Sequence, residues 1–141
     1  MEVGLVSCTK SKRSESAKPA DLYMESALFE KARAYVETHH EDWYILSAKY
    51  HLLDPNGPPI EPYDETLSGA PIDRRRKWAQ TVYDQLDETG LLARDITLVL
   101  HAGKDYYDQL LPLLEDTSVN VEIPTEGLRF GETLAWYNEH L

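Results

Sequence analysis

Cysteine is nearly absent from the chain, and long apolar runs are missing altogether. Cys8 is the one cysteine among 141 residues, so no disulfide can form within the chain and no zinc site of several cysteines can be built. No apolar run approaches the ~20 residues that a membrane-spanning helix requires. The N-terminus has no apolar stretch followed by a small-residue cleavage site, as a signal peptide would. We therefore expect a cytoplasmic protein with no membrane partner.

Two common phosphate-binding motifs are also missing. The chain contains neither the Gly-x-x-x-x-Gly-Lys of a P-loop nor the Gly-x-Gly-x-x-Gly of dinucleotide-binding folds. His51 and His140 have no ligand-like partners in the sequence, and His39 and His40 close a predicted helix, where they favour its C-terminal dipole. The sequence therefore predicts no metal site and no cofactor.

Basic residues are scarce, with 14 Lys and Arg against 25 Asp and Glu and a net charge of −11. Such a surface repels phosphate backbones unless its positive charge is concentrated. The composition fits a halophile's salt-adapted proteome, and it fits many ordinary cytosolic proteins equally well. The basic residues gather at Lys10–Lys18 and at Arg74–Lys77. The second group is interpreted either as a nucleic-acid contact or as one solvated face of a helix.

Short apolar runs alternate with amphipathic segments along the chain, whose length fits a single domain over residues 1–141. The pattern predicts strands at Glu2–Val6, Trp43–Leu46, Ile96–Leu100 and Val119–Ile123. It predicts helices at Met24–Thr38, at Ile72–Glu88, from Lys104 with a kink or split at Pro112, and at Gly131–His140. This order predicts an α/β fold, with helices on the faces of a mostly parallel sheet of four or slightly more strands.

Two long segments fall outside this pattern. Ser7–Asp21 has no apolar periodicity, and a loop of this length in a compact domain is often functional. His51–Pro71 contains five prolines, each of which removes a backbone donor. We predict that residues 51–71 form an ordered excursion within the domain, because Ile60, Tyr63 and Leu67 can anchor it.

Three predicted strands end in small polar residues followed by a lysine: Lys10, Lys49 and Lys104. Carboxyl ends of parallel strands share one edge of the sheet, and open α/β sheets bind ligands there. We expect an anionic ligand at this edge, with lysines neutralising it, hydroxyls donating hydrogen bonds and tyrosines stacking on it. The alternative for each segment is an ordinary solvated or structural loop. The predicted ligand-binding residues are Ser7, Thr9, Lys10, Lys12, Ser47, Lys49, Tyr50, Tyr63, Gly103 and Tyr106.

Catalytic groups are less clearly indicated. Cys8 could act as a nucleophile with His101 as its base, and the Ser47–Lys49 spacing is similar to that of Ser–Lys hydrolases. The competing interpretations are a small packing cysteine, a satisfied buried histidine and a plain structural turn. The candidates are therefore Cys8, Lys49 and His101, and whether the protein is an enzyme stays open.

One longer pattern, Leu-Ser-x-x-Tyr-x-Leu-Leu-x-Pro…Pro-Tyr, runs from Leu46 to Tyr63. Through this core pattern the chain resembles a group of uncharacterised small α/β proteins related to the YaaA-type peroxide-stress proteins. Further likeness lies in Ser7–Lys12 and in the tail around Gly103-x-x-Tyr106 and Gly127–Glu132. His51 departs from the pattern, because the family often has glycine there. Lys104 lies outside the matching residues, so Gly103 and Tyr106 are preferred at the third strand end.

The resemblance implies an association with peroxide resistance and DNA binding, without a settled reaction. The first loop is also similar to a domain of archaeosine synthases, which modify a deazaguanine base in tRNA. We therefore predict a cleft that binds a nucleotide, nucleobase or nucleic-acid end, in a nucleic-acid-modification or stress-related enzyme. The alternative is a non-catalytic nucleic-acid-binding module or a partner subunit of a modification system. The predicted partner is a phosphate-bearing small molecule or nucleic acid, and no oligomeric state is predicted.

Overall fold

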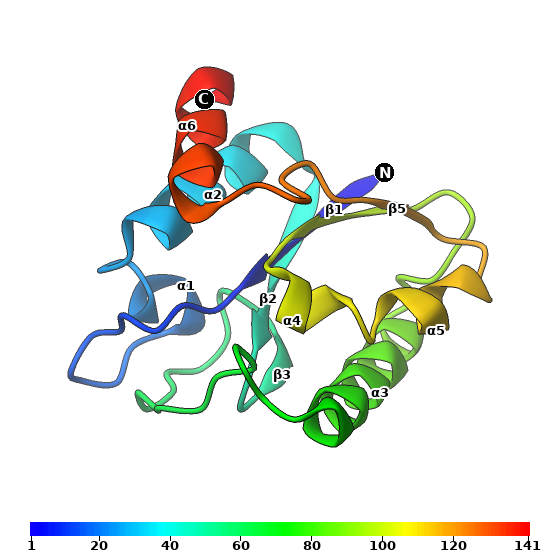
Figure 1. Cartoon of the computed structure of the whole chain (residues 1–141), viewed down its shortest axis with the longest axis horizontal. Coiled ribbons are helices and arrows are strands. Elements are labelled where there is room, and N and C mark those ends of the chain that lie inside the picture. Colours follow the sequence, from blue (N-terminus) through cyan, green and yellow to red (C-terminus); the bar gives the residue numbers. More distant parts are fainter.

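A computed structural model describes residues 1–141 and contains one five-stranded sheet in the order β3-β2-β1-β4-β5 (Figure 1). The strands β1, β2, β4 and β5 are parallel, and β3 pairs antiparallel with β2. This confirms the predicted α/β class and the mostly parallel sheet. The bounds are β1 Glu2–Ser7, β2 Asp42–Ser47, β3 His51–Leu53, β4 Thr97–His101 and β5 Asn120–Glu122.

The short strand β3 was not predicted, because it lies in the proline-rich excursion. It pairs with the end of β2, where Ser47 faces His51 in the antiparallel register. His51 adopts a left-handed backbone conformation with φ of 65°, which is uncommon for a residue other than glycine. The tight return at His51 gives the sheet an antiparallel edge strand.

Six helices cover the sheet, and α3 begins and ends where the sequence predicts. The helix predicted from Lys104 is split, because α4 ends at Tyr107 and α5 places Pro112 in its first turn. Proline is tolerated there because first-turn amides have no partner inside a helix. The helices are α1 Pro19–Leu22, α2 Ala27–His39, α3 Ile72–Glu88, α4 Lys104–Tyr107, α5 Leu111–Glu115 and α6 Phe130–His140. None of them has the length and apolar character needed to cross a membrane.

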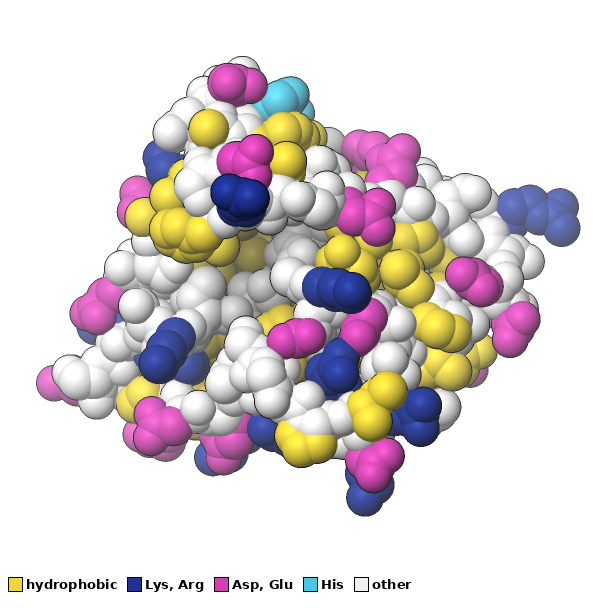
Figure 2. All heavy atoms as spheres, viewed as in Figure 1, with side chains coloured by type: hydrophobic (Ala, Val, Ile, Leu, Met, Phe, Trp, Pro, Cys, Tyr) yellow, Lys and Arg dark blue, Asp and Glu magenta, His cyan; other side chains and the backbone are white.

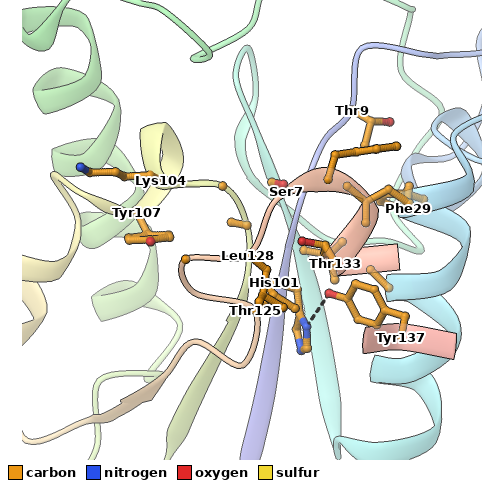
Figure 3. Close-up of a pocket in the computed structure, with 17 residues that line it drawn as sticks. Ser7, Thr9, Phe29, His101, Lys104, Tyr107, Thr125, Leu128, Thr133 and Tyr137 are labelled. Carbon is orange, nitrogen blue, oxygen red and sulfur yellow. Dashed lines mark hydrogen bonds between the residues drawn. The ribbon is translucent and has the colours of Figure 1, made fainter. Parts of the chain in front are cut away.

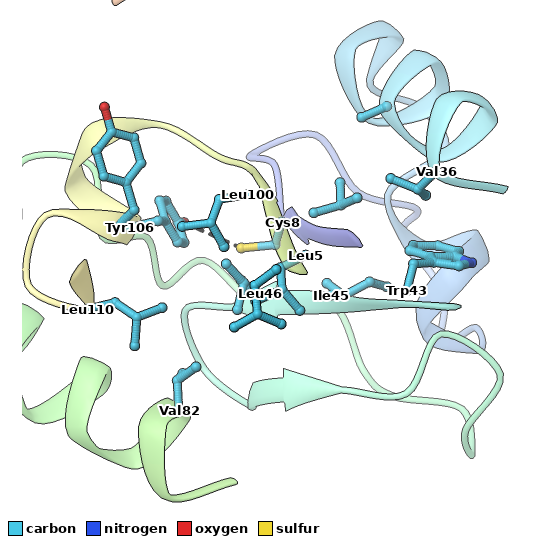
Figure 4. Close-up of a cluster of buried hydrophobic side chains, with 14 of the residues drawn as sticks. Leu5, Cys8, Val36, Trp43, Ile45, Leu46, Val82, Leu100, Tyr106 and Leu110 are labelled. Carbon is cyan, nitrogen blue, oxygen red and sulfur yellow. Dashed lines mark hydrogen bonds between the residues drawn. The ribbon is translucent and has the colours of Figure 1, made fainter. Parts of the chain in front are cut away.

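The helices form two groups, one on each side of the sheet. Helices α2 and α6 pack on each other, while α3 packs against α4 and α5 (Figure 1). On the α3 side, Leu5, Leu46 and Leu100 lie near Val82 and Tyr106 (Figure 4). Burying such side chains contributes about 1.5–3 kcal/mol each. The core therefore fixes where the loops at the carboxyl edge emerge.

The helix α2 lies unusually close to the central strand β1. A β-carbon on Gly4 would come within 2.7 Å of Val36 Cγ1 and 2.8 Å of His40 Cδ2. Only a glycine leaves room for these side chains without displacement. The absence of a side chain at Gly4 thus brings His40 against the sheet.

The strand order places an opening at the carboxyl ends of β1 and β4. After β1 the chain crosses toward β2 on one side, and after β4 it crosses toward β5 on the other side. Loops leaving neighbouring strands in opposite directions open a crevice, and ligands of open α/β sheets bind at such a switch point. A ligand site in this fold is therefore expected between the loops that follow Ser7 and His101.

Candidate functional site

Two adjoining hollows occupy the switch point and together form the cleft (Figure 2). The inner pocket, of about 400 Å³, lies under α2 and α6 and includes Val6, Phe29, His101 and Tyr137. The outer hollow, of about 900 Å³, includes the loop that follows β1 and the start of α2. The two share Ser7, Thr9, Leu28, Gly103, Lys104 and Phe130.

The inner pocket has apolar walls and a few polar groups. Its walls include Phe29 and Leu128, and its hydroxyls come from Ser7, Thr9, Tyr107, Thr125, Thr133 and Tyr137 (Figure 3). Ligand pockets of proteins are commonly of this kind, with volumes of about 300–1,000 Å³ and few polar groups. The inner pocket thus has the size and composition for the ring system of a small molecule.

His101 and Tyr137 form the buried polar part of this pocket. His101 Nδ1 lies 2.9 Å from the Tyr137 hydroxyl (Figure 3). On the other side of the ring, His101 Nε2 lies 3.1 Å from His40 Nε2. Burial, and secondarily the neighbouring His40, lower the pKa of His101 to about 3. His101 is therefore neutral at pH 7, and protein groups occupy both of its ring nitrogens.

Cys8 lines the outer hollow, but protein groups already contact its thiol. The Cys8 Sγ lies 3.3 Å from the Tyr106 hydroxyl and 3.4 Å from the Ala48 amide nitrogen. Tyr106 is itself buried, and burial raises the pKa of its phenol. No hydrogen bond connects Cys8 with His101, which lines the inner pocket instead. The structure therefore does not join the predicted nucleophile to its predicted base.

Ser47 and Tyr63 lie beneath the surface, outside the cleft. The Ser47 side chain is fully buried, and its oxygen accepts hydrogen bonds from the amides of Lys49 and Tyr50. The Tyr63 hydroxyl lies 2.7 Å from Ser47 Oγ and 2.6 Å from the Tyr23 hydroxyl. Tyr50 contacts the edge of the Tyr63 ring. These residues hold the β2–β3 turn against the proline-rich segment.

This network predicts a structural role for Ser47. Replacing it with alanine leaves the amides of Lys49 and Tyr50 without their acceptor, and an unsatisfied buried group costs about 1–3 kcal/mol. We expect Ser47→Ala to lower the free energy of unfolding by about 1–2 kcal/mol in urea titrations. Ser68→Ala is the matched control, because Ser68 is exposed. Equal stability of the two variants would contradict this role.

The lysines of the outer hollow differ in their surroundings. Lys12 Nζ lies 4.5 Å from the centre of the Tyr63 ring. Partial burial lowers the pKa of Lys12, and Asp64 is among the charges that oppose this shift. Lys10 and Lys104 are exposed and form no ion pair. Two cations therefore remain free to meet a ligand at the mouth of the cleft.

Helix α2 begins beside these lysines. Ser26 caps it, accepting a hydrogen bond from the Phe29 amide at 3.2 Å. The amides of Ala27 and Leu28 have no acceptor within the chain. First-turn amides and the helix dipole favour an anion at this position.

Carboxylates also border the outer hollow. Asp105 contacts Arg75 at 3.6 Å and accepts a hydrogen bond from the Gly69 amide at 2.9 Å. Glu25 and Asp64 are exposed. The cleft therefore has mixed charge, with its free cations concentrated at Lys10 and Lys104.

The structure places Lys49 apart from the other predicted lysines. It borders a third hollow of about 320 Å³, here called the Lys49 hollow, lined by Ala48, Lys49, His51, Glu65, Arg74, Lys77, Trp78 and Thr81. The segment from Asp64 to Thr66 lies between, because Asp64 and Thr66 line the outer hollow and Glu65 lines the third. The tight turn into β3 carries Lys49 away from the switch point, while Lys104 joins the cleft.

The Arg74–Lys77 group does not form one free basic surface. Arg75 binds Asp108 and the Ala70 carbonyl, and so fastens α3 to α4. Arg74 donates to the Thr66 carbonyl, and Arg76 donates to Gln109. Only Lys77 has no such contact.

Several cleft residues were not predicted from the sequence. Phe130, Thr133 and Tyr137 lie on α6, and Thr125 lies in the loop before it. Their spacing is that of an ordinary amphipathic helix, so it carries no sign of a site. The one available signal was the glycine-rich tail around Gly127, which belongs to the family resemblance.

Comparison with known proteins supplies a family and no activity. A model described as a family of unknown function (DUF6884) matches residues 3–139, and the chain therefore belongs to this family. No curated protein and no solved structure is detectably similar to the chain.

Proposed function

We propose that this member of a family of unknown function binds a nucleotide in the switch-point cleft, with its phosphate in the outer hollow and its base in the inner pocket. The division of the cleft carries the proposal, since an apolar chamber opens into a hollow with free cations. A nucleotide has the same division between a planar base and a charged phosphate.

The phosphate end is supported by groups from three elements. Lys10 follows β1, Lys104 begins α4, and the free amides of Ala27 and Leu28 begin α2. Charge-assisted hydrogen bonds to such donors are about twice as strong as neutral ones. The hydroxyls of Ser7 and Thr9 line both hollows.

The base end is supported by the inner pocket. Phe29 and Leu128 offer apolar contact, and the Tyr137 and Thr125 hydroxyls offer hydrogen bonds to polar edges. His101 is neutral at pH 7, so the pocket presents no buried charge to the ligand. A neutral aromatic ring suits this chamber better than a second charged group, which would lose its hydration on entry.

Nucleotide binding can be tested by calorimetry with AMP, GMP, CMP and UMP in phosphate-free buffer. We expect Lys10→Met and Lys104→Met each to weaken the tightest of these about tenfold, since one charged hydrogen bond contributes about 1.5–3 kcal/mol. Lys18→Met is the matched control, because Lys18 is exposed and borders none of the three hollows. Absence of binding at millimolar nucleotide would refute the proposal.

A second arm separates the two ends of the ligand. Thr133→Phe fills the inner pocket from α6 and should abolish binding of uncharged nucleosides as well as nucleotides. Lys10→Met should leave nucleoside binding intact. The opposite pattern would mean that the base lies outside the inner pocket.

We also propose a relationship to the YaaA-type proteins and a role in nucleic-acid modification or stress. The pattern residues between Leu46 and Tyr63 support a shared local architecture, because Ser47, Tyr50 and Tyr63 join one hydrogen-bonded and aromatic cluster. This cluster is structural, so it supports common ancestry more than a common reaction.

A further inference from the structure

The Lys49 hollow, outside the cleft, has a larger excess of positive charge than the cleft's outer hollow. Three cations, Lys49, Arg74 and Lys77, border the Lys49 hollow, and Glu65 is its one carboxylate. The outer hollow has three cations and three carboxylates by comparison. In a chain of net charge −11, such an excess of positive charge is unexpected.

None of these three cations forms an ion pair. Lys49 Nζ lies 5.5 Å from the centre of the Tyr50 ring, and Arg74 donates to a neutral carbonyl. The Lys77 side chain has no polar partner. Gathering like charges lowers the stability of the folded chain, and a bound anion would reverse that cost.

The backbone around the hollow is firmly held. The Lys49 amide donates to Ser47 Oγ, and the Trp78 indole donates to the Ser47 carbonyl at 2.8 Å. The first bond holds the β2–β3 turn itself, and the second joins that turn to α3, which carries Arg74 and Lys77. The cations therefore come from two elements whose relative position is fixed, as a binding site needs.

From this arrangement, we infer that the Lys49 hollow is a second phosphate-binding site, distinct from the cleft. Lysine binds phosphate as a point charge, and the planar guanidinium of Arg74 can offer two parallel donors. The Thr81 hydroxyl and the Trp78 surface complete the lining. His51, which is partly buried with a lowered pKa, adds no charge at neutral pH.

The phosphate has two possible sources. It can belong to a ligand that continues past the segment 64–66 from the outer hollow, or it can be carried by a separate molecule. The chemistry at the hollow is the same in both cases. The inference does not rest on the proposed nucleotide site, since orthophosphate alone tests it.

The test is an NMR titration of the full chain with sodium orthophosphate at low ionic strength, where exposed charges are least screened. We expect backbone amides near Lys49 and Thr81 to shift, and the double variant Lys49→Met/Lys77→Met to weaken that binding about tenfold or more. Phosphate should also raise the melting temperature less in this variant than in the wild type. Lys18→Met and Lys10→Met should leave these shifts unchanged.

The double variant removes like charges, so it should fold at least as well as the wild type in the absence of phosphate. Unchanged amide shifts in the double variant would overturn the inference, as would shifts confined to the cleft. Loss of AMP binding in Lys10→Met, with orthophosphate still bound at the Lys49 hollow, would separate the two sites.

Comparison of AMP with the 5′-phosphorylated dinucleotide pApA distinguishes the sources. If one ligand spans both sites, pApA should bind more tightly than AMP, and the double variant should remove that gain. If pApA and AMP bind alike while orthophosphate still occupies the hollow, the second phosphate comes from a separate molecule.

Discussion

The His101→Asn variant is expected to lose much of the acid sensitivity of the wild-type protein. The pKa of His101 is about 3 in the folded chain and ordinarily about 6.5, so the unfolded chain binds the extra proton first. The contribution of neutral His101 to the free energy of unfolding is therefore fully present above pH 6.5, and it is lost progressively as the pH falls toward 3. We expect the preferential protonation of His101 in the unfolded chain to lower the free energy of unfolding by about 3 kcal/mol between pH 7 and pH 4.

Asparagine is chosen because its amide stays neutral at every pH and can still meet the Tyr137 hydroxyl. The variant should be less stable than the wild type at pH 7, having lost its contact with His40, but its stability should change less with pH. Urea titrations at half-unit pH intervals measure this slope. His39→Asn, at an exposed position, is expected to keep the wild-type slope.

Other titratable groups surround this pair. His40 faces His101, and the rings of Tyr35 and Tyr137 contact the His101 ring. A carboxylate oxygen of Glu2 lies 3.4 Å from His40 Nδ1. Both tyrosines have raised pKa values through burial, so they remain neutral across the acid range. An unchanged slope in His101→Asn would therefore show that His101 is not the source of the acid sensitivity.

The Gly4→Ala variant is expected to be destabilised by about 2–3 kcal/mol, the upper part of the usual cost of overpacking a closely packed core. Its β-carbon meets Val36 Cγ1 at 2.7 Å and His40 Cδ2 at 2.8 Å, and both side chains are buried. Helix α2 must move away from β1 to admit the methyl group. Thermal and urea unfolding measure the loss.

The matched control is Gly131→Ala, because a β-carbon there meets no atom within 4 Å. This control should be as stable as the wild type or slightly more so, since alanine favours a helix. The double variant Gly4→Ala/Val36→Ala should recover part of the loss by removing one of the two clashes. A wild-type stability for Gly4→Ala would mean that α2 can shift freely on the sheet.

Local sequence patterns predicted most of the elements because their signals are short-range. Trp78, Val82 and Leu86 repeat at helical spacing and are buried along α3. Apolar runs ending before Ser7 and Ser47 predicted two buried parallel strands. The strand β3 could not be predicted from a local pattern, because it forms only by pairing with the end of β2 after a left-handed turn at His51.

The lysine spacing predicted lysines at the carboxyl edge of the sheet, and it was less informative about which of them would share a cleft. Lys10 and Lys104 follow β1 and β4, which are neighbours in the sheet. Lys49 follows β2, which is also a neighbour of β1, but its chain reverses at once into β3. A lysine at a strand end therefore joins the cleft only if the following backbone continues toward it.

The sequence by itself determined the α/β class, most of the strands and helices in their order along the chain, and the presence of polar loops at the strand ends, because periodicity and chain order fix these. Only the tertiary structure decided which loops share a cleft. It buried Ser47 and Tyr63, joined Tyr137 of α6 to His101 of β4, and moved Lys49 to a separate hollow. Those outcomes depend on the order of the strands in the sheet and on helix packing between residues far apart in the chain. No local sequence pattern indicates either of these.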